Sequence, residues 1–226
     1  MEAQDSIPDD MQPTNREDKV CWLPYRDGKF SIHSAWDNWR SHRPKVPWCQ
    51  SIWFKFHIPR VRTIVWMAIQ ERLSTLNRLV MFGIKDSSLC VLCSAQVEDH
   101  NHLFFACPFS CQIWNALQSK LNVSWPSMDW MELVERMNVN ISGNSSATTI
   151  MKLVFTCAIY NVWQERNLRI FQSTKSPETV IIKKVESMVR CRILSVNNFK
   201  EDNTNGWFIR VWKLPPSVPK KAPINN

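Results

Sequence analysis

Three cysteines and two histidines fall within the eighteen positions from Cys90 to Cys107. Four of them have the spacing C-x2-C-x8-H-x4-C, formed by Cys90 and Cys93 and then by His102 and Cys107. The short first gap lets two thiolates reach one ion from a tight turn, and the second pair can close a tetrahedron from across a loop. The spacing therefore predicts a structural Zn²⁺ site. Because four protein ligands leave no open coordination position, the ion would hold the fold together and carry out no chemistry.

Other interpretations of these residues stay open at this stage. Cysteine is often buried, so the thiols could be core residues, or Cys90 and Cys93 could form a redox pair. Within the zinc interpretation, His100 could replace His102, and Cys111 could replace Cys107. Pro108 favours a helix that begins directly after the last ligand, because proline is common in the first turn of a helix.

Catalytic motifs are absent from the rest of the sequence. The histidines His33, His42 and His57 have no serine or cysteine partner at a recognisable spacing. There is also no glycine-rich phosphate loop and no His-Glu-x-x-His motif. We therefore expect a protein that is not an enzyme.

The elements that must position the cysteines are predicted to be mainly helical. Only 4 of the 226 residues are glycine, which argues against an extensive turn-rich β architecture. Residues 20–32 predict a short β-hairpin around the turn Asp27-Gly28. Helices are expected from Ser34, as the N-cap, to about Ser41, and then around 52–56, 60–70 and 75–81, with the zinc loop following. After it, the apolar periodicity predicts long helices over 148–171 and 179–195, paired as a C-terminal hairpin.

Composition indicates a protein of a reducing compartment. The N-terminus is acidic and polar and resembles no export signal, so the eight cysteines do not suggest a secreted disulfide framework. The longest apolar run, 150–163, is too short for a membrane span. We expect an intracellular protein, in the nucleus or cytoplasm, that does not act at a membrane.

Charge is concentrated in one part of the chain. The full sequence has a formal net charge of +8, and residues 21–89 contain eleven basic and four acidic side chains. Lysine and arginine bind nucleic-acid phosphates without sequence preference, so the basic cluster of this segment is the candidate nucleic-acid face. Basic residues on a solvated surface remain the alternative. The cluster consists of Arg40, Arg43, Lys45, Lys55, Arg60 and Arg62.

A series of short motifs runs between Trp22 and Leu117. They are Trp22 with Asp27-Gly28-Lys29-Phe30-Ser31 and Ser34-Ala35-Trp36, Trp48 with Ile52-Trp53 and Ile58-Pro59, Val65-Trp66-Met67-Ala68, Arg72-Leu73-Ser74-Thr75 with Arg78-Leu79, and the cysteine-histidine segment closing on Phe109-Ser110 and Ile113-Trp114. In this order they resemble the zinc-binding domain at the C-terminal end of reverse transcriptases in plant non-LTR (LINE-type) retrotransposons. A later segment, Tyr160 to Asn167 with Phe171, is similar to the Trp-x-Glu-Arg-Asn segment that commonly follows that domain.

The resemblance implies a binding role and supplies no catalytic residue. We find no endonuclease-like region, no polymerase palm and no room for a ribonuclease H domain after residue 213, so we expect the tail of a retroelement protein or a derivative of one. The implied partners are RNA or DNA, bound without sequence specificity, together with a polymerase domain on another chain. A structural or protein-interaction remnant is the alternative function.

Together these observations predict a small zinc-stabilised helical domain, with a short N-terminal β-hairpin, followed by a C-terminal helical hairpin. The expected domains are a disordered acidic lead over 1–19, the reverse-transcriptase-type zinc domain over 20–122, a linker with a short helix over 123–147, the helical hairpin over 148–213 and a disordered tail over 214–226.

Overall fold

The computed structural model describes residues 20–41, 46, 48–124, 129–130, 132, 134–136, 143, 145–196 and 210–213. The chain divides into two compact units, with the boundary between Lys45 and Val46. The predicted domain boundaries at 122 and 147 stay predictions.

Among the described residues of the N-terminal unit, one helix forms, α1 over Ile32–Trp39. Ser31 is its N-cap, and Ser31 and Ser34 form a reciprocal capping box in which each side chain accepts a hydrogen bond from the other's backbone N–H. Helix α1 was expected to begin at Ser34, and the structure corrects this by three residues. The two serines stand three positions apart, so either could have supplied the cap.

The predicted β-hairpin is wrong, because residues 20–31 contain turns and no strand. Trp22 donates a backbone hydrogen bond to the Gly28 carbonyl at 2.8 Å, and the Tyr25 carbonyl accepts from Gly28 at 3.0 Å. Gly28 does adopt a positive φ, of 65°. A two-stranded hairpin is marginal by itself, and Pro24 has no N–H for a ladder. The turn signal of Asp27-Gly28 was therefore not enough to make strands of so short a segment.

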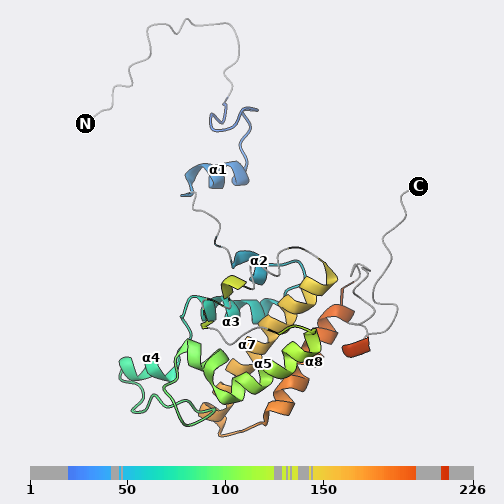
Figure 1. The fold of residues 1–226 in the computed structure, drawn as a ribbon. Helices are drawn as coiled ribbons and strands as arrows, with labels where there is room; N and C mark the ends of the chain where they lie inside the picture. The colour runs from blue at the N-terminus through green and yellow to red at the C-terminus, as the bar shows by residue number, and fades with distance from the viewer. Residues whose placement is uncertain are drawn as a thin grey trace, which may run out of the picture. The chain divides into compact units, whose positions relative to one another are not determined.

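The C-terminal unit is built from helices packed around one core (Figure 1). No β-strand longer than a single bridge occurs in the part of the chain that the structure describes. The elements of this unit are α2 over Cys49–Ile52, α3 over Pro59–Ile69, α4 over Leu76–Met81, the π-helix η1 over His102–Ala106, α5 over Pro108–Leu121, α7 over Ser146–Gln172 and α8 over Glu178–Leu194.

Helix α7 is the central element of this unit. Its 27 residues pack against α2, α3, η1, α5 and α8, and most of its side chains from Ile150 to Trp163 are buried. Helices α7 and α8 lie side by side, as predicted, but α5 packs on both of them (Figure 1). The hairpin therefore shares its core with the helices around the cysteines.

An aromatic cluster joins the segment between the cysteines to this core. The Phe105 ring stacks on Trp130 at 5.6 Å and on Phe155 of α7 at 6.3 Å, and the Trp114 ring of α5 meets Phe155 edge to face. Trp130 lies fully buried within the segment predicted to be a linker. Such ring pairs stabilise a core beyond the area that they bury.

Candidate metal centre

Cys90 and Cys93 lie on a tight loop that is closed by a single antiparallel bridge between Leu89 and Val97. We call residues 88–98 the knuckle. Inside it, the Ser94 N–H donates to the Cys90 carbonyl at 2.7 Å, and the Cys90 N–H donates to the Gln96 carbonyl at 2.8 Å. Ser94 turns the chain with a φ of 57°. This turn points both thiols toward the same side.

His102 and Cys107 are brought together by the π-helix η1 and by the start of α5. The Cys107 N–H donates to the His102 carbonyl at 2.6 Å, a bond that spans five residues. An α-helix advances about 100° per residue, so residues five apart would lie on different sides of it. The wider π turn reduces this offset, which is one reason such turns occur at functional sites. Cys107 is then the N-cap of α5, with Pro108 in the first turn.

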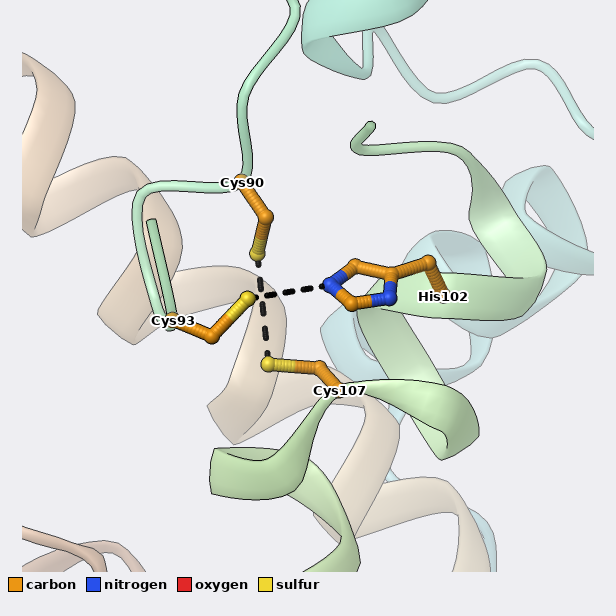
Figure 2. Close-up of side chains that lie close together, drawn as sticks. All are labelled: Cys90, Cys93, His102 and Cys107. Atoms are coloured by element: carbon orange, nitrogen blue, oxygen red, sulfur yellow. Dashed lines mark hydrogen bonds between the residues drawn. The ribbon is translucent and has the colours of Figure 1, made fainter. Parts of the chain in front are cut away.

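The four side chains converge on one point (Figure 2). Their ligand atoms all lie within 4.8 Å of one another. The Sγ atoms of Cys90 and Cys107 are 3.9 Å apart, and Cys93 Sγ is 3.3 Å from His102 Nε2. A tetrahedral zinc ion with sulfur ligands at about 2.3 Å would place two sulfurs about 3.8 Å apart. The donor set and its spacing therefore fit structural Zn²⁺, which when bound would cross-link the knuckle to α5.

A hydrogen bond links two of the four side chains, Cys90 and Cys107. Cys90 donates its S–H to Cys107, and this bond together with burial raises the pKa of Cys90. The same bond lowers the pKa of Cys107, which accepts it. Burial lowers the pKa of His102 and so favours the neutral imidazole that a metal requires. Zinc ligation needs deprotonated thiols, so metal uptake would release thiol protons.

The structure also decides between the ligands that the sequence left open. Cys111 points elsewhere, because its Sγ donates a hydrogen bond to the Phe105 carbonyl at 2.6 Å. The His100 ring is buried beside Phe104, with 6.5 Å between ring centroids, and does not belong to the cluster. His102 and Cys107 are the residues that the structure brings to Cys90 and Cys93.

Helix α7 binds the knuckle through hydrogen bonds from Arg169. This guanidinium donates to the carbonyls of Leu92 at 3.1 Å and Val91 at 3.4 Å, the two residues between the first pair of cysteines. It also lies 4.4 Å from the centre of the Phe109 ring of α5. Glu165 fixes Arg169 through a contact of 2.9 Å and accepts the Ser176 N–H at 2.7 Å.

A second ion pair anchors the far end of the knuckle. Arg166 of α7 donates from both Nε and Nη2 to Glu98 Oε1 at 2.9 and 2.8 Å, and the two side chains are 1% and 0% exposed. Glu98 Oε1 also accepts the Leu76 N–H of α4, and Arg166 donates to the Ser74 carbonyl. A buried carboxylate needs such partners, because an unpaired charge in the interior is costly.

These contacts give the Trp163-to-Asn167 segment a structural role that the sequence did not reveal. Its Arg166, together with Arg169, which Glu165 holds, connects α7 to the knuckle. Periodicity within α7 marks its buried side but cannot identify a partner so far away. The similarity of this segment to a known motif was the only signal available.

Of the six residues predicted to bind nucleic acid, three lie in the C-terminal unit. Lys55 and Arg60 are exposed, and Arg62 is half-buried with its Nη1 2.8 Å from His57 Nε2. Arg40 belongs to the N-terminal unit, where it pairs with Asp37 at 2.7 Å. Arg43 and Lys45 lie outside the described residues.

The structure places one further cation, Arg192, near Lys55. Arg192 of α8 donates from Nε to the Phe56 carbonyl at 2.9 Å, and the Phe56 ring lies 5.4 Å from Lys55 Nζ. We call Lys55, Arg60, Arg62 and Arg192 the basic group. Arg192 is 136 residues from Phe56 in the chain, so no local pattern could have placed it there.

Among the described residues, no helix combines the length and the apolar character needed to cross a membrane.

Comparison with known proteins agrees with the site. Residues 30–114 match a family model described as zinc-binding in reverse transcriptase. A protein of Arabidopsis thaliana named "Putative ribonuclease H protein" is 27% identical over 105 residues, which are 45% of this chain and 17% of that relative. The chain thus spans less than a fifth of the length of this relative. No solved structure matches this chain. The resemblance read from the sequence is therefore confirmed: residues 30–114 match the zinc-binding family of reverse transcriptases, and the match contains all four side chains of the metal centre.

Proposed function

We propose that this chain is a zinc-stabilised module that binds nucleic acid and is not an enzyme. It would resemble the accessory domain of a LINE-type reverse transcriptase and hold template RNA or target DNA. Its partners would be RNA or DNA, bound without sequence preference, and a polymerase domain on another chain. It would act inside the cell, in the nucleus or cytoplasm.

The observation that carries this proposal is the basic group. No acidic residue occurs between Asp37 and Glu71, which is the part of the chain that contributes Lys55, Arg60 and Arg62. None of the four cations of the basic group takes part in an ion pair among the described residues. Cations without carboxylate neighbours keep their charge available for phosphates.

The neighbouring helix α7 adds no opposing charge there. From Ser146 to Gln164 it contains Lys152 and no acidic residue. The Arg60 guanidinium lies 5.5 Å from the ring centre of Tyr160 in this part of α7, which places the helix against the basic group. By contrast, Glu165 and Glu98 are buried at the zinc end, where each is paired with an arginine. Zinc in this proposal shapes the fold, and the basic group meets the phosphates.

Salt-dependent binding tests the proposal. For the wild-type protein, log affinity for a nucleic acid of mixed sequence should fall linearly with log salt concentration. The double variant Lys55→Ala/Arg60→Ala should bind more weakly, and its salt slope should be shallower by about one for each phosphate contact that is lost.

A matched control removes the same charge at the other end of the unit. Lys85 follows α4 and Lys175 follows α7, and both side chains are exposed. Helix α4 and the α7–α8 connection lie away from α2 (Figure 1). Lys85→Ala/Lys175→Ala should keep most of the affinity. Equal losses in the two double variants would mean that net charge alone attracts the nucleic acid, and binding without salt dependence would contradict the proposal.

A protein-interaction role is the second candidate, favoured by one observation. Large apolar side chains are exposed where α4 ends and beside it on the knuckle, namely Met81, Phe82, Ile84, Leu89 and Val97. Such patches commonly mark protein contacts. The salt experiment separates the two roles, because only phosphate binding predicts the linear dependence.

A further inference from the structure

Trp53 stands two residues before Lys55 of the basic group in the chain and has no assigned role in the proposed function. Its side chain is 42% exposed, although Ile52 and Phe54 on either side of it are buried. Lys55, the next residue after Phe54, is exposed as well. The chain thus buries Phe54 and turns Trp53 and Lys55 outward.

The indole of Trp53 is held by a second ring. Trp48, which packs partly buried against the core, lies 5.7 Å from it between ring centres, with an angle of 34° between the ring planes. Trp53 also lies directly after α2, and its backbone N–H donates to the Cys49 carbonyl at 2.9 Å. A ring fixed in this way loses little freedom when a ligand stacks on it.

The surroundings of Trp53 select among planar ligands. Lys55 lies two residues away and Arg60 seven, and no carboxylate occurs in this part of the sequence. An aromatic ring flanked by cations suits a ligand that has flat rings joined by negative charges. Nucleic acid whose bases are unpaired is such a ligand, whereas the bases of a duplex are stacked inside it and present only phosphates.

We propose that Trp53 is a stacking platform for an unpaired base, and that the module therefore prefers single-stranded nucleic acid over duplex. Lys55 and Arg60 bind the phosphates beside that base. The inference rests on the proposed function, since it assigns a ligand class to the same surface.

The test compares a single-stranded oligonucleotide of mixed sequence with the duplex of the same sequence. Wild type should bind the single strand more tightly. Trp53→Ala should weaken single-strand binding about 5-fold or more, the range that loss of one base–aromatic stack produces. Its affinity for the duplex and the salt slope of that binding should not change, because the cations remain.

Three further variants sharpen the result. Trp53→Phe keeps an aromatic face and should retain part of the single-strand affinity, whereas Trp53→Leu keeps apolar bulk without a π face and should behave as Trp53→Ala does. Trp36→Ala is the control, because Trp36 is 66% exposed and lies beside the Asp37–Arg40 ion pair. Thermal unfolding and zinc content of each variant establish that it is folded.

The outcomes separate this inference from the proposed function. If wild type binds both ligands with steep salt dependence but Trp53→Ala loses nothing, the stacking platform is wrong and the proposed function stands. Equal losses in Trp53→Ala for both ligands, or an equal effect of Trp36→Ala, would also overturn it. If wild type binds neither ligand, the proposed function fails and this inference fails with it.

Discussion

His102 and Cys107 show how a single residue position decides a metal site. The sequence offered His100 and Cys111 as alternatives, and spacing alone could not exclude them. The π turn of η1 settles the choice, because it places Cys107 beside His102 while Cys111 turns to the Phe105 carbonyl. Whether a helix will contain a π turn cannot be read from one sequence with the usual periodicity rules, since it depends on what the turn packs against.

Replacement of one thiol provides a direct check of the ligand set. Cys93→Ser should remove a zinc ligand, so the purified variant should lack metal and unfold at much lower temperature or fail to fold. Structural zinc contributes about 10–16 kcal/mol of apparent binding free energy in small metal-dependent folds, so loss of the ion removes most of the stability. Metal content by mass spectrometry and thermal unfolding with and without chelator measure both effects.

Cys111→Ser is the matched control for this experiment. A serine hydroxyl can donate to the Phe105 carbonyl in place of the thiol, so this variant should keep one zinc per chain and most of its stability. Metal loss in Cys111→Ser together with metal retention in Cys93→Ser would show that the ligand set is wrong.

At the scale of elements, most of the helices that periodicity predicted are present in the structure, but the helix expected around 52–56 is wrong, because α2 covers Cys49–Ile52 and ends where that helix should continue. The prediction of 60–70 agrees with α3 at Pro59–Ile69, and that of 179–195 with α8 at Glu178–Leu194. These segments carry apolar side chains at helical spacing and end at recognisable boundaries, so local chemistry is sufficient. The prediction of a hairpin around Gly28 was wrong because strands need partners, and a segment of thirteen residues does not tell whether a sheet is there to pair with it.

The pairing of Arg166 with Glu98 could not be predicted from the sequence, because it also depends on partners that lie far away in the chain. Each residue by itself looks like an ordinary surface charge of an amphipathic segment. Their sequence separation is 68 residues, and both are buried only because α7 packs against the knuckle. Composition supplies the charges, but only the packing of the elements brings them together.

Removal of Arg166 should measure how strongly the knuckle is attached to α7. Arg166→Met leaves the Glu98 carboxylate buried with one backbone donor, the Leu76 N–H, among the described residues. Breaking a buried pair in this way costs about 3–5 kcal/mol, which urea unfolding at neutral pH would detect as a lower midpoint. Adding Glu98→Gln should recover part of the loss, because the buried charge is then gone.

An exposed pair gives the reference for this measurement. Arg136 lies 3.9 Å from Glu132, and both side chains are largely exposed. Arg136→Met should change the stability by less than about 1 kcal/mol, since solvent screens such pairs. A cost for Arg166→Met no larger than this would mean that the Arg166–Glu98 pair does not anchor the knuckle.

At the scale of the whole molecule, the family match and the folding unit have different boundaries. The match ends at residue 114, within α5, whereas the core continues through α7 and α8. Arg166 and Arg169 of α7 hold the knuckle, and Phe155 completes the aromatic cluster. Residues of the cysteine segment and of α7 and α8 belong to the same core, within one compact unit. A motif can mark the metal ligands without including everything that positions them.

Truncation after Ser145 should therefore unfold the zinc site, although all four ligands and the whole family match remain. The shortened chain loses the face on which α3 and α5 pack, and it leaves Glu98 without Arg166 and the Leu92 carbonyl without Arg169. Loss of partners that orient metal ligands typically lowers metal affinity about 10- to 100-fold, and loss of the core should remove cooperative unfolding as well. Competition with a chelator and thermal unfolding followed by circular dichroism compare the fragment with the full chain. A fragment that binds zinc as tightly as the full chain and melts in an equally sharp transition would show that the matched domain folds by itself and that α7 is only a neighbour.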